Sequence, residues 1–554
     1  MAVRLPVNIA LIFLLCQRRF VDPATLLTVF LIAIFGALLG IGSALIPGMH
    51  INTFSLLLLS LYPELSLLLS SFSLASVTYL DPPMMFAILL VSAATGSSFT
   101  DFLPSTFLGL PESDTSMSML PAHRLLLQGK GMDAVRFSAT GSLLGALLAV
   151  LATYPLQLLM RPPFLLGDAL SLCLPYLLLV IVAMLILSEH GPRRTIAFLD
   201  LRSGHAKRAE EVNIRLPIPI DGEEGVLTGR AIRRGFCRSK ILTPHGVFFV
   251  RHRTPLPKGQ LHLRGIWCVK ESRGVGRLRA FLLIMLSGLL GFCVMEAHPP
   301  WGDVFPGMGQ SLLFPLLSGL FAFPALISSF SSGPVPPQDA AQEASISILP
   351  ALRGSLAGFL SGWLPGITST IGATIGTLLS PPSRDQEQAS KDYLLMLAAV
   401  GTSAAVFSIL ALCIEGEART GAMLVLEKAL GKERTSELSH FPAPEFSMLI
   451  LAVLVSAIIG YLLSLKAGAL LSQRVAGRDL RKLNQGVLIL LLLMILAFCG
   501  LGGIVVLMAS IPLGLLPAHL GVKRVHLTGC LLLPLLFLRF GLEDEVIALL
   551  WNAP

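Results

Sequence analysis

Charged residues are scarce in this sequence, since Asp, Glu, Lys and Arg make up only 13% of its 554 residues. A soluble globular domain carries about 25% charged residues. This scarcity, together with 54% apolar residues and a mean hydropathy of +0.77, excludes an ordinary water-soluble surface. Apolar runs recur along almost the whole chain. The composition therefore predicts a polytopic integral membrane protein.

The sequence also lacks the signatures of metal, disulfide and catalytic sites. Its eight cysteines are scattered, with no C-x-x-C pair and no His–Cys cluster at ligand spacing, so neither zinc nor disulfides are indicated. It contains no H-E-x-x-H, G-x-S-x-G or Walker motif. We therefore expect no enzyme and no cofactor, apart from Na⁺ or H⁺ as a coupling ion.

Long apolar runs mark the membrane-spanning segments, each of which needs about 20 residues. Ten candidates begin near Ala24, Met84, Phe137, Asp168, Arg279, Ser311, Tyr393, Phe446, Gln485 and Val525. Shorter apolar runs at 51–61, 65–80, 367–379 and 501–516 are expected to be half-helices or re-entrant segments. These patterns predict ten to twelve spans, with an N-terminal membrane half at 1–188 and a C-terminal one at 279–554.

Residues 189–278 differ from both halves and are predicted to form a soluble insert. The stretch 188–279 carries 19 Lys and Arg against 8 Asp and Glu, and five of its arginines lie beside the flanking spans. The positive-inside rule places such a segment in the cytoplasm of a cell-membrane protein. Alternating runs such as GVFFVRHR predict a small OB-like β domain. An anionic lipid surface is the favoured partner, whereas nucleic acid is not.

One sequence pattern occurs twice, once in each half. GALLGIGSALIPG (Gly36–Gly48) and GSLAGFLSGWLPG (Gly354–Gly366) share the spacing G-x-L-x-G-x-x-S-x-x-x-P-G. Glycines four apart let helices pack closely, and Pro-Gly ends a helix. Broken helices at matching places in two halves are typical of secondary transporters with inverted repeats, whose helix starts face an anionic substrate.

The predicted substrate site consists of the two Pro-Gly breaks and the polar residues that follow them. These are Pro47, Gly48, His50, Asn52, Thr53, Pro365, Gly366, Thr368, Ser369 and Thr370. His50 is expected either to donate to a substrate carboxylate or titrate as a coupling group, or to cap or pack against a helix. The Asn, Ser and Thr side chains can also cap the following half-helices.

A second group of polar residues is predicted to couple transport to an ion. Carboxylates among hydroxyl oxygens suit a hard cation or a proton relay. The candidates are Asp101, Glu112, Asp114, Thr115 and Thr402. The alternative for the acids is a solvated position at the membrane interface.

Four stretches in order resemble one family, the large permeases of tripartite tricarboxylate transporters (TctA type), in particular its archaeal branch. They are GSALIPGMHINT, STFLGLPESDTSMSMLPAHRLLLQGKGMDAV, LLFPLLSGLFAFPALI with the later VPPQ, and GWLPGITSTIGATIGTLLSPP. GEARTGAM also fits, whereas Ser403 stands in GTSAAVF where the family pattern has Asn. The resemblance implies carboxylate transport on an ion gradient beside a small membrane subunit and an extracytoplasmic binding protein.

These observations predict an all-α polytopic membrane protein of two inverted halves with a β-rich cytoplasmic insert. Its expected function is secondary transport of an organic anion, a carboxylate, by alternating access. Two alternatives remain open. One is a carrier of a lipid-linked phosphate, and the other is a membrane scaffold whose insert binds RNA or protein. The expected partners are the bilayer, a small anionic substrate and the two subunits named above, and the chain is also a candidate homodimer.

Overall fold

The computed structural model groups the chain into two compact units. Unit 1 comprises Met1–Val182, Met285–Leu515 and Leu527–Pro554, and unit 2 comprises Ala183–Ile284 and Leu516–His526. The residues that the structure describes are 23–46, 51–71, 80–107, 119–161, 163–189, 193–198, 200–201, 211–214, 224–234, 238–243, 246–251, 260–271, 273–296, 312–329, 335–339, 346–364, 367, 369–380, 386–416, 418–437, 444–479 and 481–551.

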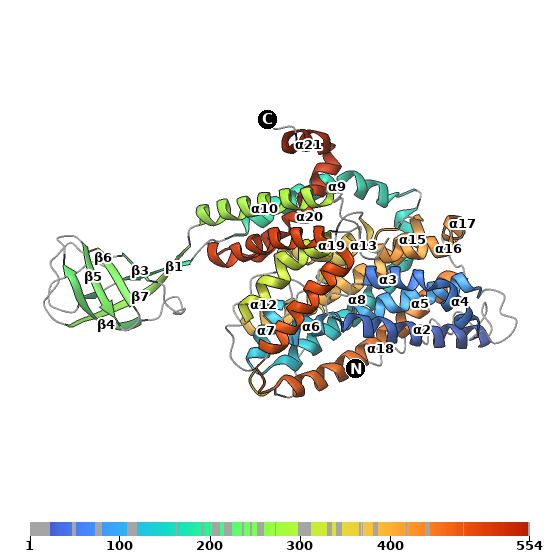
Figure 1. The fold of residues 1–554 in the computed structure, drawn as a ribbon, viewed down its shortest axis with the longest axis horizontal. Coiled ribbons are helices and arrows are strands. Elements are labelled where there is room, and N and C mark those ends of the chain that lie inside the picture. Colours follow the sequence, from blue (N-terminus) through green and yellow to red (C-terminus); the bar gives the residue numbers. More distant parts are fainter. Residues whose placement is uncertain are drawn as a thin grey trace. The chain divides into compact units, whose positions relative to one another are not determined.

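Helices dominate both membrane segments (Figure 1). They are α2 (Pro23–Ala44), α3 (Ile51–Ser60), α4 (Tyr62–Ser71), α5 (Pro82–Ser97), α6 (Phe102–Phe107), α7 (Met119–Leu127), α8 (Gly131–Met160), α9 (Leu166–Leu187), α10 (Arg273–Glu296), α11 (Leu313–Leu317), the π-helix η1 (Ser318–Ala322), α12 (Phe323–Ser329), α13 (Leu349–Trp363), α14 (Ser369–Leu378), α15 (Gln386–Glu415), α16 (Gly421–Leu430), α17 (Lys432–Glu437), α18 (Pro444–Val475), α19 (Arg481–Leu520), the 3-10 helix η2 (Arg524–Thr528), α20 (Gly529–Phe540) and α21 (Glu543–Trp551).

Eight helices within the described residues are long and apolar enough to cross a membrane. They are Pro23–Ala44, Pro82–Phe107, Gly131–Met160, Leu166–Leu187, Gly274–Glu296, Glu387–Glu415, Pro444–Val475 and Arg481–Leu520. They coincide with eight of the ten predicted spans. The candidates near Ser311 and Val525 instead contain the shorter apolar helices Leu313–Ile327 and Gly529–Phe540. The multi-pass class is confirmed, with fewer spans among the described residues than the ten to twelve predicted.

Helix α19 consists of two helices that meet at a break in its middle. Gly500 has φ 60° and ψ −156° inside this 40-residue element. Side chains avoid positive φ, so glycine suits the break. The run 501–516, predicted to be a half-helix, therefore lies in a second helix that follows the break at Gly500.

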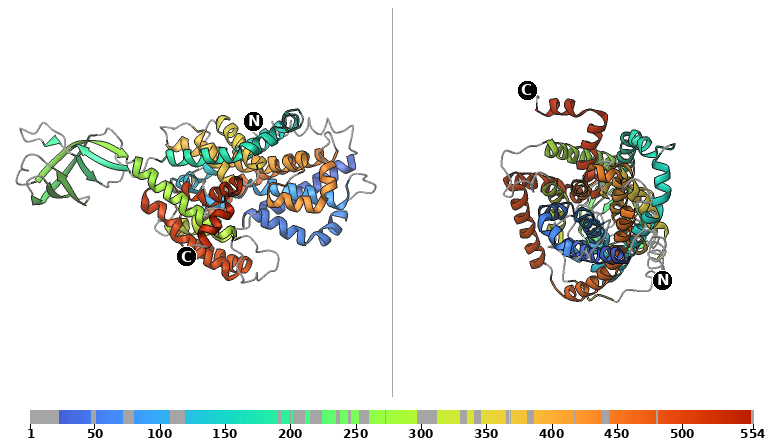
Figure 2. Two further views of the ribbon diagram at one scale, coloured as in Figure 1. Left: turned by 90° about the horizontal axis from the view of Figure 1, so that it is seen from above. Right: turned by 90° about the vertical axis from the view of Figure 1, so that its right-hand side faces the viewer.

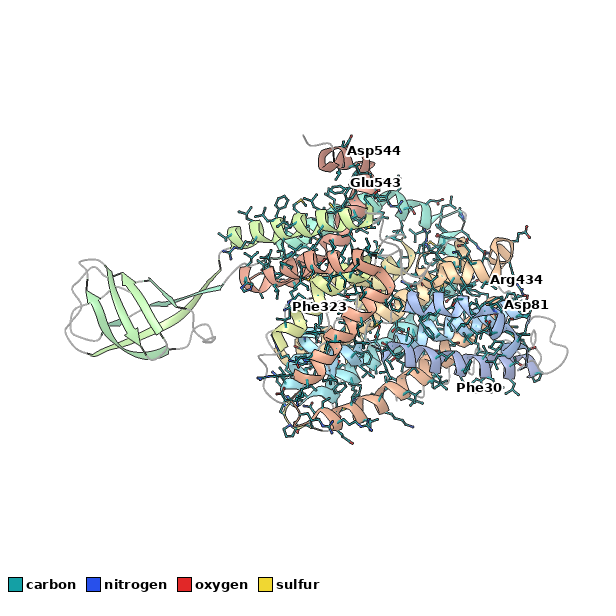
Figure 3. All side chains as sticks on the ribbon, in the orientation of Figure 1. Phe30, Asp81, Phe323, Arg434, Glu543 and Asp544 are labelled. Atoms are coloured by element: carbon teal, nitrogen blue, oxygen red, sulfur yellow. The ribbon has the colours of Figure 1, made fainter. Side chains whose placement is uncertain are left out.

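The outer surface of unit 1 carries many large apolar side chains. Phe30 extends outward from α2 (Figure 3), and Leu172 of α9 is 76% exposed. Water would penalise such a surface by about 25 cal/mol per Å², whereas lipid tails do not. The exposed apolar faces are therefore those expected to contact lipid.

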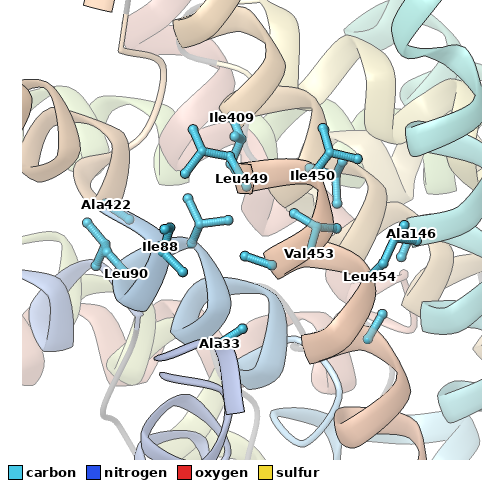
Figure 4. Close-up of a cluster of buried hydrophobic side chains, with 14 of the residues drawn as sticks. Ala33, Ile88, Leu90, Ala146, Ile409, Ala422, Leu449, Ile450, Val453 and Leu454 are labelled. Carbon is cyan, nitrogen blue, oxygen red and sulfur yellow. The ribbon is translucent and has the colours of Figure 1, made fainter. Parts of the chain in front are cut away.

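Three helices, α5, α15 and α18, form the buried centre of unit 1. The apolar window of the span that contains α5 is 89% buried, and that of α15 is 83% buried. Ile88, Ile409 and Val453 come from these three helices and meet in one apolar cluster (Figure 4). The polar groups described below are thus held in a closely packed frame.

The repeated glycines bring corresponding helices into close contact. A Cβ at Gly40 would overlap the carbonyl oxygen of Ala93 on α5. A Cβ at Gly354 would likewise overlap the carbonyl oxygen of Met396 on α15. Helix α2 therefore packs on α5 as α13 packs on α15. In Figure 2 the blue helices from 23–107 gather together accordingly.

The next long helix of each half packs against the other half. On α8, Gly141 and Gly145 face the carbonyl oxygens of Leu395 and Ala399 on α15. On α18, Gly460 faces the ring of Phe99, just beyond the end of α5. The two halves therefore exchange helices within one bundle, and their association depends on small residues.

A buried ionic cluster joins the N-terminal ends of α8 and α15. The ammonium of Lys391 lies 2.9 Å from Asp133 and 2.8 Å from Glu387. Lys130 lies 2.6 Å from the same Glu387. Lys391 and Asp133 are 6% and 2% exposed, so each charge depends on its partner for the solvation that water would otherwise supply.

Unit 2 contains an antiparallel sheet of seven described strands. They are β1 (Arg193–Phe198), β2 (Asp200–Leu201), β3 (Glu211–Ile214), β4 (Glu224–Arg234), β5 (Arg238–Thr243), β6 (Gly246–Arg251) and β7 (Gln260–Glu271). The order β1-β3-β6-β5-β4-β7 closes on itself through pairing of β7 with β1, for example Arg194 with Lys270. This ring has six members, whereas the barrel of an OB-fold has five strands.

A second buried ion pair lies in unit 2, where α9 ends. His526 Nε2 is 2.7 Å from Glu189 Oε2, and the two side chains are 0% and 4% exposed. The backbone N–H of Lys523 donates to the same carboxylate oxygen. Glu189 thus ties the end of α9 to the segment after α19.

Candidate functional site

A polar cavity of about 280 Å³ lies inside unit 1, where several helices begin or end. Its lining comes from the ends of α2 and α13, the starts of α3, α14 and α16, and the middle or end of α5 and α15. The lining residues are Ala44, Ile51, Asn52, Ala94, Ser97, Ser98, Asp101, Ser361, Ile367, Ser369, Gly401, Ala404, Ala405, Ser408, Arg419, Thr420, Gly421, Ala422 and Met423.

Arg419 supplies the positive charge on the described wall. It is held by the carboxylate of Glu415, which also accepts a hydrogen bond from Trp363. Arg419 Nη2 donates to Glu415 Oε2 at 2.7 Å. Trp363 Nε1 donates to the other oxygen, Glu415 Oε1, at 2.9 Å. The Arg419 side chain is only 10% exposed. Since a guanidinium has five N–H donors, the bond to Glu415 uses only part of its hydrogen-bonding capacity.

The start of α16 is capped from two directions. Thr420 is its N-cap and accepts a hydrogen bond from the N–H of Met423 at 3.3 Å. Asn52 Oδ1 accepts from the N–H of Ala422 at 3.0 Å. These bonds satisfy two of the N–H groups that a helix start leaves open. The amide of Asn52 is thereby fixed against α16, where Gly421 leaves room for it.

Hydroxyl groups and one carboxylate form another part of the wall. Ser97, Ser98 and Asp101 lie at the C-terminal end of α5. The hydroxyl of Ser98 is 3.1 Å from that of Thr402, which is fully buried on α15. This oxygen-rich region contains the negative charge on the described lining.

The structure brings together some of the predicted site residues. Asn52, Ser369 and Asp101 line the cavity, and Thr402 lies behind Ser98. Thr53 and Thr370 lie on α3 and α14. The other predicted residues fall outside the described part of the chain: Pro47, Gly48, His50, Glu112, Asp114, Thr115, Pro365, Gly366 and Thr368. Their roles remain predictions.

Several lining residues were not among the predicted site residues, above all Arg419, for which the sequence favours a structural ion pair with Glu415 or Glu417 over a contact with the substrate. Its ion pair with Glu415 is present, but the same side chain also borders the cavity. An Arg-Thr-Gly sequence between two apolar helices was the available signal, since Thr followed by Gly marks a helix start there. Ser97, Ser361 and Ser408 carried no signal in the sequence, and each also donates to a carbonyl oxygen of its own helix.

Ser403, which stands where the family pattern has Asn, has a packing role. Its hydroxyl donates to the carbonyl oxygen of Ala399 at 2.5 Å, and Gly358 of α13 lies against it. Ser403 is not part of the cavity lining. The departure therefore alters a contact between helices rather than the described wall of the site.

Outside the spans, His123 on α7 lies close to the backbone of Thr106. Its Nδ1 is 3.4 Å from the Thr106 carbonyl oxygen. Burial lowers the pKa of His123 from its ordinary value, and the hydrogen bond to Thr106 opposes part of that decrease. The neutral form of this imidazole is therefore favoured in the folded protein.

The apolar exterior and the eight candidate spans together define a multi-pass membrane protein, and a partly open cavity with polar residues lies among its helices. The model of the tripartite tricarboxylate transporter TctA family matches residues 30–201 and 260–529, which is more than half of the chain. The chain belongs to this family. It is a family of transporters and not of enzymes.

A curated protein also resembles part of this chain. The chain is 34% identical over 118 residues to an uncharacterized protein of Methanocaldococcus jannaschii. The similar region covers 21% of this chain and 26% of that relative. No solved structure matches.

Proposed function

We propose that the cavity is the substrate site of a secondary transporter that moves a small carboxylate-bearing solute, using a Na⁺ or H⁺ gradient. The observation that carries this proposal is the matching position of Ile51 and Ser369. Each stands three residues after the repeated Pro-Gly, each begins a short helix, and both line the cavity. The two copies of the repeated pattern thus contribute to one site.

The packing of the helices supports alternating access between two related halves. Helix α2 packs on α5 and α13 on α15, while α8 and α18 are exchanged between the halves. Such an arrangement suits an inverted repeat, in which one bundle rocks against the other around a fixed midpoint. In this proposal the cavity opens alternately to either side of the membrane.

The charges of the site support a carboxylate as the transported group. Arg419 is held at the cavity wall by Glu415, and its planar guanidinium matches a carboxylate in a two-bond geometry. The start of α16 adds a partial positive charge next to it. The predicted coupling group, Asp101 and Thr402 with Glu112, Asp114 and Thr115, would hold the driving ion.

We propose further that the protein lies in the cell membrane with residues 189–278 in the cytoplasm. The arginines beside the flanking spans support this orientation. We also infer that it works as the large membrane component beside a small membrane subunit and an extracytoplasmic binding protein, as the family description implies. Labelling of single cysteines in the insert from either side of sealed vesicles tests the orientation.

Uptake by proteoliposomes tests the transport proposal. The purified full chain is reconstituted, and entry of labelled mono-, di- and tricarboxylates and amino acids is measured with and without Na⁺ and pH gradients. Saturable uptake of at least one carboxylate compound, abolished in Arg419→Gln and retained in Arg434→Gln, is expected. Arg434 is a suitable control because it pairs with Asp81 away from the cavity. Absence of flux for every compound, with and without the inferred partner subunits, would overturn the proposal.

A further inference from the structure

The fixed charges around the cavity do not match a substrate with several negative charges. Arg419 and Asp101 are the charged residues on the described lining, and they have opposite signs. Arg419 is also already bonded to Glu415, a second carboxylate. A di- or tricarboxylate would bring further negative charge beside two acids and one cation. Like charges repel, so the described wall disfavours a polyanion.

The two charged regions of the cavity lie at different helix ends. Arg419, Thr420 and Gly421 stand at the start of α16, where the helix dipole is positive. Ser98 is the C-cap of α5, and Asp101 stands between the end of α5 and the start of the short helix α6. The dipole of α16 therefore reinforces the charge of Arg419, whereas the negative charge comes from the Asp101 side chain. A ligand with one negative and one positive group complements both regions.

Another part of the wall is apolar and made mostly of small side chains. It contains Ala44, Ile51, Ala94, Ile367, Ala404, Ala405, Ala422 and Met423. The volume of about 280 Å³ is at the lower limit of pockets that bind drug-sized ligands. This combination favours a small metabolite with a compact aliphatic side chain.

We propose that the cavity binds a neutral aliphatic α-amino acid as its zwitterion, with the carboxylate at Arg419 and the ammonium at Asp101. This inference rests on the proposed function and specifies its substrate class. It also gives Asp101, a member of the predicted coupling group, a direct contact with the substrate beside the driving ion.

Competition on the wild-type protein tests the inference without any substitution. Uptake of labelled leucine into proteoliposomes is measured against unlabelled leucine, 4-methylpentanoate, 3-methylbutylamine and citrate. 4-Methylpentanoate lacks only the ammonium of leucine, and 3-methylbutylamine lacks only the carboxylate. Since one charge-assisted hydrogen bond is lost in each analogue, both should compete at least about tenfold more weakly than leucine, and citrate should not compete.

Substitution of Asp101 tests the assignment of the ammonium. Asp101→Asn should reduce the preference for leucine over 4-methylpentanoate at least about tenfold. Asp81→Asn is the matched control, since Asp81 lies outside the cavity lining and caps α5 through a side-chain oxygen that Asn retains. It should keep the wild-type preference.

Three results would overturn the inference while leaving transport intact. They are stronger competition by citrate than by leucine, sodium-dependent uptake of 4-methylpentanoate as good as that of leucine, and an unchanged preference in a folded Asp101→Asn protein. By contrast, failure of every carboxylate compound to enter the vesicles would overturn the proposed function itself.

Discussion

The side-chain oxygen of Asn52 accepts a hydrogen bond from the backbone N–H of Ala422, at 3.0 Å and 370 positions further along the chain. This bond links the half-helix that follows the first Pro-Gly break to the helix start beside Arg419. The polar residue after the break therefore shapes the site through a second helix. A ligand at Arg419 would be sensitive to Asn52 even without touching it.

Two substitutions of Asn52 should distinguish its role as a cap of α16 from the effect of a negative charge at the cavity wall. Asn52→Ala removes the acceptor at the start of α16, and loss of a cap costs about 0.5–2 kcal/mol. Asn52→Asp keeps an acceptor but adds a negative charge to the cavity wall. We expect the Ala variant to unfold more readily in detergent, and the Asp variant to keep its stability but take up substrate more weakly. Equal stability of Asn52→Ala and wild type would contradict the cap.

Glu415 should act as a positioning residue for Arg419. Glu415→Gln keeps the shape but weakens the bond to the guanidinium, which as a charged hydrogen bond contributes about 1.5–3 kcal/mol. We expect the KM for uptake to rise roughly 10-fold to 100-fold, with the maximal rate reduced far less. Arg419→Lys should not restore uptake, because an ammonium lacks the planar fork. A fall in maximal rate at unchanged KM would argue against this role.

The repeated glycines should tolerate no side chain. Gly40→Ala places a Cβ against the carbonyl of Ala93, and overpacking of this kind costs about 1–3 kcal/mol. Gly42→Ala is the matched control on the same helix, since a Cβ there would meet no atom of the described residues within 4 Å. It should be neutral or stabilising by up to about 1 kcal/mol. Thermal unfolding in detergent compares the two variants, and equal effects would count against close packing of α2 on α5.

The effects of substituting Lys391 and Asp133 on the free energy of unfolding should be strongly coupled. Removing one member of a buried ion pair costs about 3–5 kcal/mol, whereas replacing both by apolar residues is often neutral. Lys391→Met and Asp133→Leu should each destabilise the protein, and the double variant should recover much of the loss. Glu387, which also contacts Lys391, will limit that recovery in the double variant. Additive effects in a double-mutant cycle would exclude the coupling.

Stability should depend on pH through His123. Its pKa is lowered in the folded protein, so the unfolded chain binds the proton first as the pH falls. The free energy of unfolding is therefore highest above the unfolded-state pKa of about 6.5 and decreases as the pH falls from there through the lower folded-state pKa. His123→Gln should flatten this part of the stability curve. An unchanged acid dependence in this variant would assign the effect to other groups.

The membrane class and most spans were predictable because lipid imposes a local rule. About 20 apolar residues are needed for each crossing wherever the segment lies in the fold. Eight of ten predicted starts therefore coincide with long apolar helices in the described residues. The two remaining segments contain shorter helices, because local hydropathy does not set the length of a helix that packs inside the bundle.

The site residues were predictable only where a Pro-Gly pattern in the sequence marked the end of a helix. Pro-Gly marked the region that leads to Ile51 and Ser369, and both line the cavity. The sequence did not show whether Arg419 is exposed or buried, because an i,i+4 pair with Glu415 is equally typical of a surface helix. Its place at the cavity depends on helices that are distant along the chain.

The sequence by itself determined that this chain is a multi-pass membrane protein, that it belongs to a transporter family, and that the same helix break occurs in both halves. These properties follow from composition and short motifs, each of which acts locally. Only the tertiary structure decided that Asn52 caps α16, that Trp363 and Arg419 share Glu415, and that Asp101 lies on the same cavity as Arg419. Such contacts depend on the packing of small residues between distant helices, and that packing is a property of the whole bundle.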